Sequence, residues 1–209
     1  MSPLLALFLA VVPDTPPLPL VEADWPSFRK QVRELLTHLE TLKAPLPPKT
    51  AKAIRRILDD EKVDPEIASN RVQQLLDAHC LVRVTINPES RVKAARGPLT
   101  ANLVRDEATL LLVKVHNQAG LTHPLGVTSD QAIVAGKKDA DRWVEATILT
   151  SKPFTNRLTG NSLEYRVLRL TARQSGKREA TLSFDVGQGT QDLGFRAEVP
   201  ILFMIRPPR

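Results

Sequence analysis

The hydrophobic periodicity changes within the stretch Leu75-Leu76-Asp77-Ala78-His79-Cys80-Leu81-Val82-Arg83-Val84-Thr85-Ile86. Upstream of this stretch, apolar residues recur about every 3.6 positions, as they do on one face of an amphipathic helix. From Cys80 onward the period is about 2, as in strands that bury one face. The sequence therefore predicts a helical segment over residues 25–79, followed by a β domain over residues 80–206.

The helical segment is expected to contain about three short helices. Asp24 and Asp64 each precede a first turn that contains proline, which is typical of helix N-caps. A proline cluster over residues 45–48 separates the first helix from the second. Helices this short need to pack on each other or on the β domain. The residues expected to face inward are Phe28, Val32, Leu35, Leu36, Leu39, Leu42, Ala51, Ile54, Ile57, Leu58, Ile67, Val72, Leu75 and Leu76.

Short apolar runs separated by Gly, Pro and Asn fill the β domain, and no helix-length pattern lies between them. This argues against a parallel βαβ sheet and for an antiparallel β-sandwich of immunoglobulin-like or Greek-key type. The predicted fold class is therefore α+β. The expected strands cover residues 81–86, 91–95, 110–116, 125–128, 143–149, 163–171, 179–185 and 197–205.

The first residues form an apolar run that Pro13 ends. The run is too short to span a bilayer as a helix, and it matches the h-region of a signal peptide. We therefore expect residues 1–12 to be a signal-peptide h-region and the chain to be exported, with no transmembrane helix in its mature form. The alternative is a frayed apolar N-terminus. Residues 13–24 are expected to form a Pro-rich linker, and residues 207–209 a linker-like end.

The chain carries a formal net charge of +6, and its sequence pI is about 9.7. Its Lys and Arg residues are scattered among Asp and Glu, and only 4% of its residues are aromatic. Few rings are thus available for stacking on bases, so nucleic-acid binding is disfavoured. Cys80 is the one cysteine, which excludes an internal disulfide. Its apolar neighbours predict a buried, inert thiol.

No motif for catalysis or metal binding is present in the sequence. A metal site needs several converging ligands, but the four histidines form neither an HxH nor an HExxH pattern. His116 and His123 flank one loop in which their rings could meet, although two histidines without further ligands are more simply loop residues. The sequence also lacks a GxSxG elbow. We expect no catalytic residue, no metal and no cofactor in this chain.

Basic groups and one Gly-rich loop are the candidates for a ligand or partner surface. The densest basic groups are Arg91, Lys93 and Arg96 in one strand and Lys177 with Arg178 at a turn between two strands. The loop over residues 187–194 joins two expected strands, and such loops carry ligand sites when they are not purely structural. Its candidate residues are Gln188, Thr190 and Asp192.

Four stretches, residues 86–97, 112–120, 163–167 and 176–196, carry a resemblance to a known family. They resemble the N-terminal, non-catalytic region of exported CehA/McbA-family metallohydrolases, of the PHP superfamily. The resemblance covers the chain from about Trp25 to its end. It implies a signal peptide and a helical stretch before a β-rich region, with the catalytic domain far downstream. The HxH-type metal motifs of that superfamily do not occur here, so no catalytic residue is carried over.

The sequence therefore favours a non-catalytic accessory or binding module. Its partner would be a hydrolase domain, another exported protein or a glycan. The alternative is a fragment or subunit of a PHP-type metallohydrolase whose catalytic domain lies on other residues.

Overall fold

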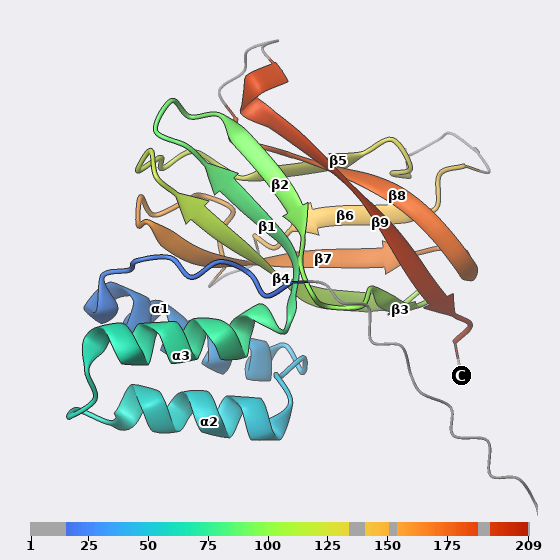
Figure 1. Ribbon diagram of the computed structural model, residues 1–209. Helices are drawn as coiled ribbons and strands as arrows, with labels where there is room; N and C mark the ends of the chain where they lie inside the picture. The colour runs from blue at the N-terminus through green and yellow to red at the C-terminus, as the bar shows by residue number, and fades with distance from the viewer. Residues whose placement is uncertain (1–15, 134–140, 151–153, 188–192, 209) are drawn as a thin grey trace, which may run out of the picture.

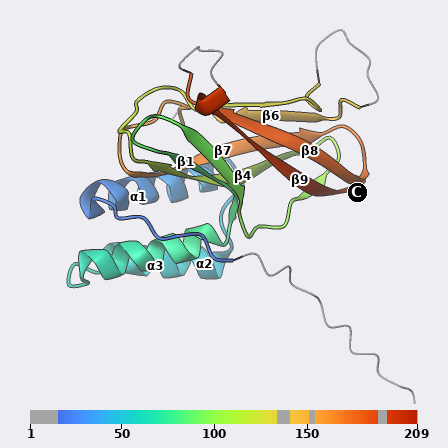
Figure 2. The same cartoon turned by 45° about the horizontal axis from the view of Figure 1, so that its top comes forward.

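The computed structural model describes residues 16–133, 141–150, 154–187 and 193–208. The signal-peptide prediction for residues 1–12 lies outside these ranges. The described chain has a helical layer and two β-sheets stacked in order (Figures 1 and 2). The α+β class and the order of helices before strands are confirmed.

Three helices form the first layer: α1 (Trp25–Thr41), α2 (Pro48–Asp59) and α3 (Pro65–Asp77). The two predicted N-caps are present. The Asp24 carboxylate accepts a hydrogen bond from the Ser27 N–H at 3.1 Å, and Asp64 accepts from two N–H groups of the first turn of α3 at 3.0 Å. Each carboxylate satisfies donors that have no partner within the helix, so it defines where the helix begins.

Most of the apolar stripe faces inward as predicted, but two of its residues do not. Leu42 follows the end of α1 and is 39% exposed, and Ile67 is 49% exposed. The buried face of α3 carries Ala68, Val72 and Leu76 at intervals of four. Ile67 precedes that series by one position, which turns it by about 100° away from the buried face. The prediction that Ile67 faces inward is therefore wrong.

Every segment expected to be a strand is one, and a short strand, β3, was missed. One sheet, called sheet A below, has the order β2-β1-β4-β7-β6, and the other, sheet B, has the order β3-β9-β8-β5. The strands are β1 (Cys80–Ile86), β2 (Val92–Arg96), β3 (Asn102–Val104), β4 (Ala108–Asn117), β5 (Gly126–Ser129), β6 (Val144–Ile148), β7 (Leu163–Ala172), β8 (Gly176–Asp185) and β9 (Arg196–Arg206).

Both sheets are mixed, so the expectation of a purely antiparallel sandwich is wrong. Strand β1 pairs with β4 in parallel, and β3 pairs with β9 in parallel. After the β1–β2 hairpin the chain crosses to sheet B at β3 and returns to sheet A as β4, on the other side of β1. A crossover through the opposite sheet joins parallel strands without a helix. The lack of helices between the strands was therefore not enough to exclude parallel pairs.

Two hydrophobic clusters hold the layers together. The larger one fills the sandwich between the sheets and includes Trp143 against Phe203, with ring centroids 5.6 Å apart. The second lies between sheet A and the helices and joins Leu112, Leu163 and Val167 to the inner faces of α1, α2 and α3. The helical segment thus shares a core with the β domain and forms its third layer.

Residues 16–24, the described part of the expected linker, form an extended strap that is fixed to the protein. Leu18 and Val21 are buried in the helix-facing cluster. The Val21 N–H donates to Oε1 of Gln73 at 2.9 Å, and Nε2 of Gln73 donates to the Val21 carbonyl at 2.8 Å. The Gln73 side chain therefore pairs with the strap much as a neighbouring strand would.

Candidate functional site

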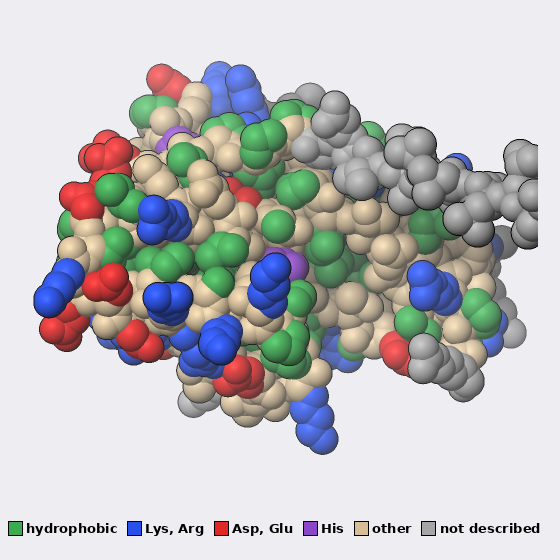
Figure 3. Space-filling view, turned by 60° about the horizontal axis from the view of Figure 1, so that its bottom comes forward, with side chains coloured by type: hydrophobic (Ala, Val, Ile, Leu, Met, Phe, Trp, Pro, Cys, Tyr) green, Lys and Arg blue, Asp and Glu red, His purple; other side chains and the backbone are tan. Residues whose placement is uncertain are grey.

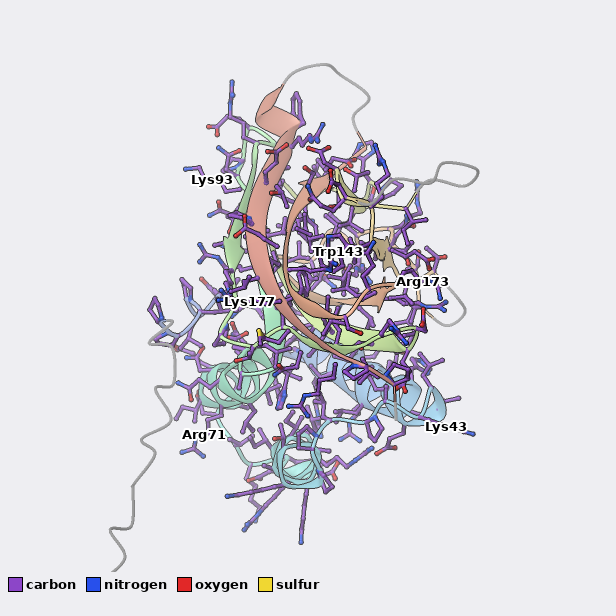
Figure 4. The ribbon with its side chains drawn as sticks, turned by 90° about the vertical axis from the view of Figure 1, so that its right-hand side faces the viewer. Lys43, Arg71, Lys93, Trp143, Arg173 and Lys177 are labelled. Carbon is purple, nitrogen blue, oxygen red and sulfur yellow. The ribbon has the colours of Figure 1, made fainter. Side chains whose placement is uncertain are left out.

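The basic residues singled out from the sequence lie in two different sheets. Lys93 and Arg96 are exposed on β2, an edge of sheet A, and Arg91 directly precedes this strand. Lys177 and Arg178 are at the start of β8 in sheet B (Figure 4). Within the described ranges, no hydrogen bond or ion pair joins the two groups. The predicted residues Gln188, Thr190 and Asp192 lie outside the described residues.

The charges on β2 also have a structural explanation. Lys and Arg on an edge strand discourage pairing with the strands of another molecule, because a charge would have to be buried. Seen from the helical side, the surface carries Lys and Arg interspersed with Asp and Glu (Figure 3). Basic character alone therefore does not single out a site on this protein.

A groove of about 630 Å³ lies between α1 and the chain that leads into β7. Its volume falls within the range of small-ligand sites, and it lies where two layers of the fold meet, as such sites often do. Its lining combines hydroxyl, amide, aromatic and charged side chains: Ser27, Lys30, Gln31, Glu34, Leu35, His38, Phe154, Thr155, Thr159, Asn161, Tyr165 and Arg166. We call this the α1–β7 groove.

One face of α1 forms a wall of the α1–β7 groove. Lys30, Glu34 and His38 follow one another at intervals of four on α1, beside the buried stripe that holds the helix on sheet A. Gln31 joins this wall to the sheet, because its Oε1 accepts a hydrogen bond from the Tyr165 N–H at 3.2 Å. The wall is therefore fixed by the same contacts that dock α1.

A buried ion pair on β7 fixes the opposite wall. Glu164 is fully buried, and its carboxylate accepts from the Thr159 N–H at 2.8 Å and from the Arg166 guanidinium. The same guanidinium donates to the Arg157 carbonyl at 2.6 Å. The pair thus ties residues 157–159 to the strand by charge-assisted hydrogen bonds.

Burial governs the protonation behaviour of this pair. Desolvation raises the pKa of Glu164, whereas the charge of Arg166 lowers it; desolvation likewise lowers the pKa of Arg166, and Glu164 raises it. We treat both groups as charged, because each stabilises the other's charged form. Arg166 is only 9% exposed and lines the groove, and its buried Nε has no partner in the described part of the chain.

An aromatic contact closes one part of the groove. The rings of His38 and Phe154 meet edge to face, with centroids 5.6 Å apart and an interplanar angle of 74°. Both residues are half-buried, so part of each ring remains accessible from the groove. An accessible ring beside hydroxyl and amide groups can bind a ligand that has both an apolar face and polar edges.

A second hollow, of about 690 Å³, lies between the strap and the start of α3. Its charged lining residues are all acidic: Glu22, Asp24 and Glu66. The Asp24 carboxylate is engaged as the cap of α1, and hydrogen bonding by Ser27 lowers its pKa. We consider the α1–β7 groove the stronger candidate because it presents both donors and acceptors and a buried guanidinium.

Asp77, Lys114 and Tyr165 form a hydrogen-bonded trio that resembles acid–base machinery but is sealed. The ammonium of Lys114 lies 2.8 Å from one oxygen of Asp77, and the Tyr165 hydroxyl donates to the other at 2.7 Å. The exposed fractions are 0% for Lys114, 5% for Asp77 and 3% for Tyr165. No substrate can reach groups so covered. Because Lys114 also donates to the Pro19 carbonyl at 2.9 Å, the trio anchors strap, α3 and sheet A together.

Cys80, His38 and His116 lie in different parts of the protein. Cys80 is free and buried as predicted, and desolvation raises the pKa of its thiol well above the usual range. His38 lines the α1–β7 groove, and His116 is on the face of β4 that is turned away from the sandwich core. Within the described ranges, no three His, Cys, Asp or Glu side chains lie close enough to hold a metal ion. Among the described helices, none is long and apolar enough to cross a membrane.

The decisive groove residues were missed at the level of sequence. Glu164 and Arg166 are an oppositely charged pair two positions apart in a largely apolar strand, which is a signal for a buried ion pair. Their partners at residues 157–159 and the facing helix α1 come from other parts of the chain. No spacing rule connects them, so only the tertiary packing reveals the site.

No family model matches the chain, and no curated protein matches it either. Some solved structures are weakly similar. The structure of PbICP-C in complex with falcipain-2 matches with a TM-score of 0.30 and 11% identity, over 61% of this chain and 92% of that one. The cysteine protease inhibitor EhICP2 from Entamoeba histolytica matches with a TM-score of 0.27 and 9% identity, over 59% of this chain and 95% of that one. Domains 4 and 5 of the S-layer protein SbsC match with a TM-score of 0.28 and 16% identity, over 51% and 41%. At these TM-scores the similarities carry no argument about function.

Proposed function

We propose that this chain is a non-catalytic accessory module that binds a glycan in the α1–β7 groove. The observation that carries the proposal is the lining of the groove, where the accessible ring of Phe154 lies among amide and hydroxyl groups on walls that are already fixed. A sugar presents an apolar ring face and a rim of hydroxyl groups. Such a ligand matches an aromatic surface surrounded by groups that both donate and accept.

The polar groups of the groove suit neutral hydroxyl groups. Gln31 and Asn161 carry amides, and Thr155 and Thr159 carry hydroxyls, so each can donate and accept. The walls are held by the Glu164–Arg166 pair and by Gln31 before any ligand binds. Preorganised walls lower the entropic cost of binding, which favours affinity.

The carboxylates of this region favour binding over cleavage. Glycoside hydrolysis generally requires two carboxyl groups that flank the scissile bond. Glu34 lines the α1–β7 groove, whereas Glu164 is fully buried with its oxygens engaged by Thr159 and Arg166. Among the described residues of the groove, Glu34 supplies the one accessible carboxylate, and this supports a binding role.

The resemblance to the N-terminal region of exported CehA/McbA-family metallohydrolases supports an exported location and a hydrolase as the neighbouring partner. In this proposal the module positions a larger enzyme on a glycan. We also propose that the sandwich is of immunoglobulin-like or Greek-key type. The competing function is that of a fragment or subunit of a PHP-type metallohydrolase.

The test begins with the labelled full chain on a glycan array, followed by calorimetric titration with each glycan that binds. We expect Phe154→Ala and Asn161→Ala to weaken binding at least about tenfold, as loss of a buried ring contact or a specific hydrogen bond does. The matched control is Met204→Ala, which removes an exposed apolar side chain on the opposite side of the sandwich and should change affinity less than about twofold.

Two results would overturn the proposal. One is a chain that binds no glycan on the array. The other is glycan binding that Phe154→Ala and Asn161→Ala leave unchanged. Metal analysis of the purified chain, with a phosphoesterase assay, tests the competing function. Stoichiometric metal together with activity would favour a hydrolase.

A further inference from the structure

A basic surface lies on the face of sheet A that is turned away from the sandwich core, where β2, β1 and β4 run side by side. Val82, Val84 and Ile86 of β1 face the sandwich core, so Arg83 and Thr85 between them lie on the opposite face, which the helices and the strap share. The strand register places Lys93 of β2 and His116 of β4 on either side of Thr85. These neighbours form a row across three strands, with adjacent Cα atoms about 5 Å apart.

Lys114 is the neighbour of Arg83 in the next row. The charge of Lys114 is balanced, because its ammonium is bound to Asp77. No carboxylate pairs with Arg83 or Lys93 in the described part of the chain. Glu22 and Asp24 of the strap border a hollow beside His116, and Asp77 is held by Lys114 and Tyr165. Asp77 also attracts Arg83, but it is already bound to Lys114, so the surface formed by Arg83, Thr85 and Lys93 keeps an excess of positive charge.

Two polar atoms on this surface lack partners. Nε of Arg83 and Oγ1 of Thr85 are both buried and form no hydrogen bond in the described part of the chain. Leaving a polar atom buried without a partner costs free energy, so a pair of such atoms in one place marks a candidate site for a group that can hydrogen-bond to both. The two residues are two positions apart on the same strand face, so their Cα atoms lie about 6.7 Å from each other.

We propose that Arg83, Thr85 and Lys93 bind a tetrahedral oxyanion, a phosphate or sulfate group, on the face of β1 and β2 that is turned away from the sandwich core. Guanidinium, hydroxyl and ammonium groups all donate hydrogen bonds, and an oxyanion offers several acceptor oxygens to share among them. Arg83 and Lys93 are long side chains whose rotamers can turn toward a bound ion. This site is separate from the α1–β7 groove and does not depend on glycan binding there.

His116 supplies a local probe of this surface. Burial lowers the pKa of its imidazole, and the positive charges of Arg83 and Lys114 lower it further. An anion bound beside Arg83 and Thr85 would offset these charges, so it would raise the pKa of His116. An ion bound elsewhere on the protein would leave that pKa unchanged at constant ionic strength.

The test is an NMR titration of the full chain with sodium phosphate, sodium sulfate or sodium acetate at matched ionic strength. We expect saturable shifts of the amides of Arg83, Thr85 and Lys93 with phosphate or sulfate, together with a higher His116 pKa. The relative affinities of phosphate and sulfate show which of the two groups the site prefers. Acetate should bind at least about fivefold more weakly, because it has fewer acceptor oxygens.

Four variants complete the test. Arg83→Gln should weaken oxyanion binding about tenfold or more, and Lys93→Gln about three- to tenfold. Lys177→Gln, which removes an exposed positive charge from sheet B, should change it less than about twofold. If Arg83→Gln does not fold, oxyanion binding by Lys93→Gln and Thr85→Val tests the proposal, and both variants should bind more weakly than the parent chain. The absence of saturable shifts, equal effects of Lys93→Gln and Lys177→Gln, or acetate binding as tight as that of phosphate and sulfate would each overturn the proposal.

Discussion

Strands β7 and β9 are both central in their sheets, yet they are covered differently. Every residue of β7 except Arg169 is buried, because the sandwich core covers one face and the helices cover the other. In β9, buried Val199, Ile201, Phe203 and Ile205 alternate with exposed or half-buried residues, because one face of sheet B is open to solvent. A third layer thus turns an alternating strand into a continuously buried one.

Because both faces of β7 are covered, its buried charged and hydroxyl groups depend on partners within the protein. Glu164 and Arg166 bind each other and residues 157–159, and the Tyr165 hydroxyl binds Asp77 of α3. These bonds build one wall of the α1–β7 groove and anchor the helices. On the open face of sheet B, polar side chains also contact one another, but the ion pair of Arg196 with Glu198 is exposed to solvent. The junction between sheet A and the helices differs because its ion pair, Lys114 with Asp77, is buried.

The largest expected effect comes from breaking the trio that anchors the helical layer. Asp77→Ala leaves the Lys114 ammonium buried without its carboxylate, which should lower the free energy of unfolding by about 3–5 kcal/mol. Urea unfolding followed by circular dichroism measures it. The control is Asp59→Ala, which breaks an exposed pair with Arg33 and should cost less than about 1 kcal/mol. Equal costs for the two variants would mean that the trio does not anchor the layer.

Alanine substitutions on the two strands test the comparison directly. On β7, Leu163→Ala on the helix side and Leu168→Ala on the sandwich side should each cost about 2–5 kcal/mol, since both residues are buried. On β9, Phe203→Ala should cost about 3–5 kcal/mol, but Met204→Ala, at a position 44% exposed, only about 0.5 kcal/mol. Chemical unfolding of the four variants measures these costs. A Leu163→Ala variant as stable as the parent chain would show that the helices do not cover β7 in solution.

A smaller effect is expected where the strap meets α3. Gln73→Ala removes both hydrogen bonds to Val21 and should cost about 1–3 kcal/mol. Hydrogen exchange at the Val21 amide should become faster in this variant. Gln74→Ala, at an exposed position one residue along, is the matched control. Unchanged exchange at Val21 in Gln73→Ala would contradict the account of the strap.

The smallest effect concerns the N-cap of α1, whose contribution to the stability of the fold should depend on pH. Hydrogen bonding by Ser27 lowers the pKa of Asp24 in the folded state. The stabilisation is therefore present above the unfolded-state pKa of about 3.9, and it is lost as pH falls through the lower folded-state pKa. Asp24→Asn keeps an acceptor but cannot titrate. The parent chain should be the more stable at neutral pH, and the difference in melting temperature should shrink as the solution becomes strongly acidic. A constant difference would contradict this.

The sequence predicted the elements of the fold better than their arrangement. The change of period at Cys80 placed the boundary between helices and strands, because burial of one face leaves a local pattern in each element. The parallel pairing of β1 with β4 was missed, because residues that pair across strands leave no periodic signal. Strand β3 was missed because three residues are too short to show alternation.

The candidate sites were harder to predict than the fold. Lys93 was selected from the sequence as part of a basic group, and the structure adds Arg83 and Thr85 beside it through the pairing of β2 with β1. The α1–β7 groove was not predicted at all. Its walls come from residues such as Gln31 and Tyr165, which the fold brings together across most of the chain.

Glycan binding at the junction between α1 and β7 is best tested by an amide chemical-shift map of the full chain, recorded with the glycan that binds most tightly on the array. We expect saturable shifts at Gln31, Thr159 and Asn161, and we expect Phe154→Ala to need at least about tenfold more glycan to reach them. Shifts confined to β8 and β9, or shifts that persist unchanged in Phe154→Ala, would contradict it.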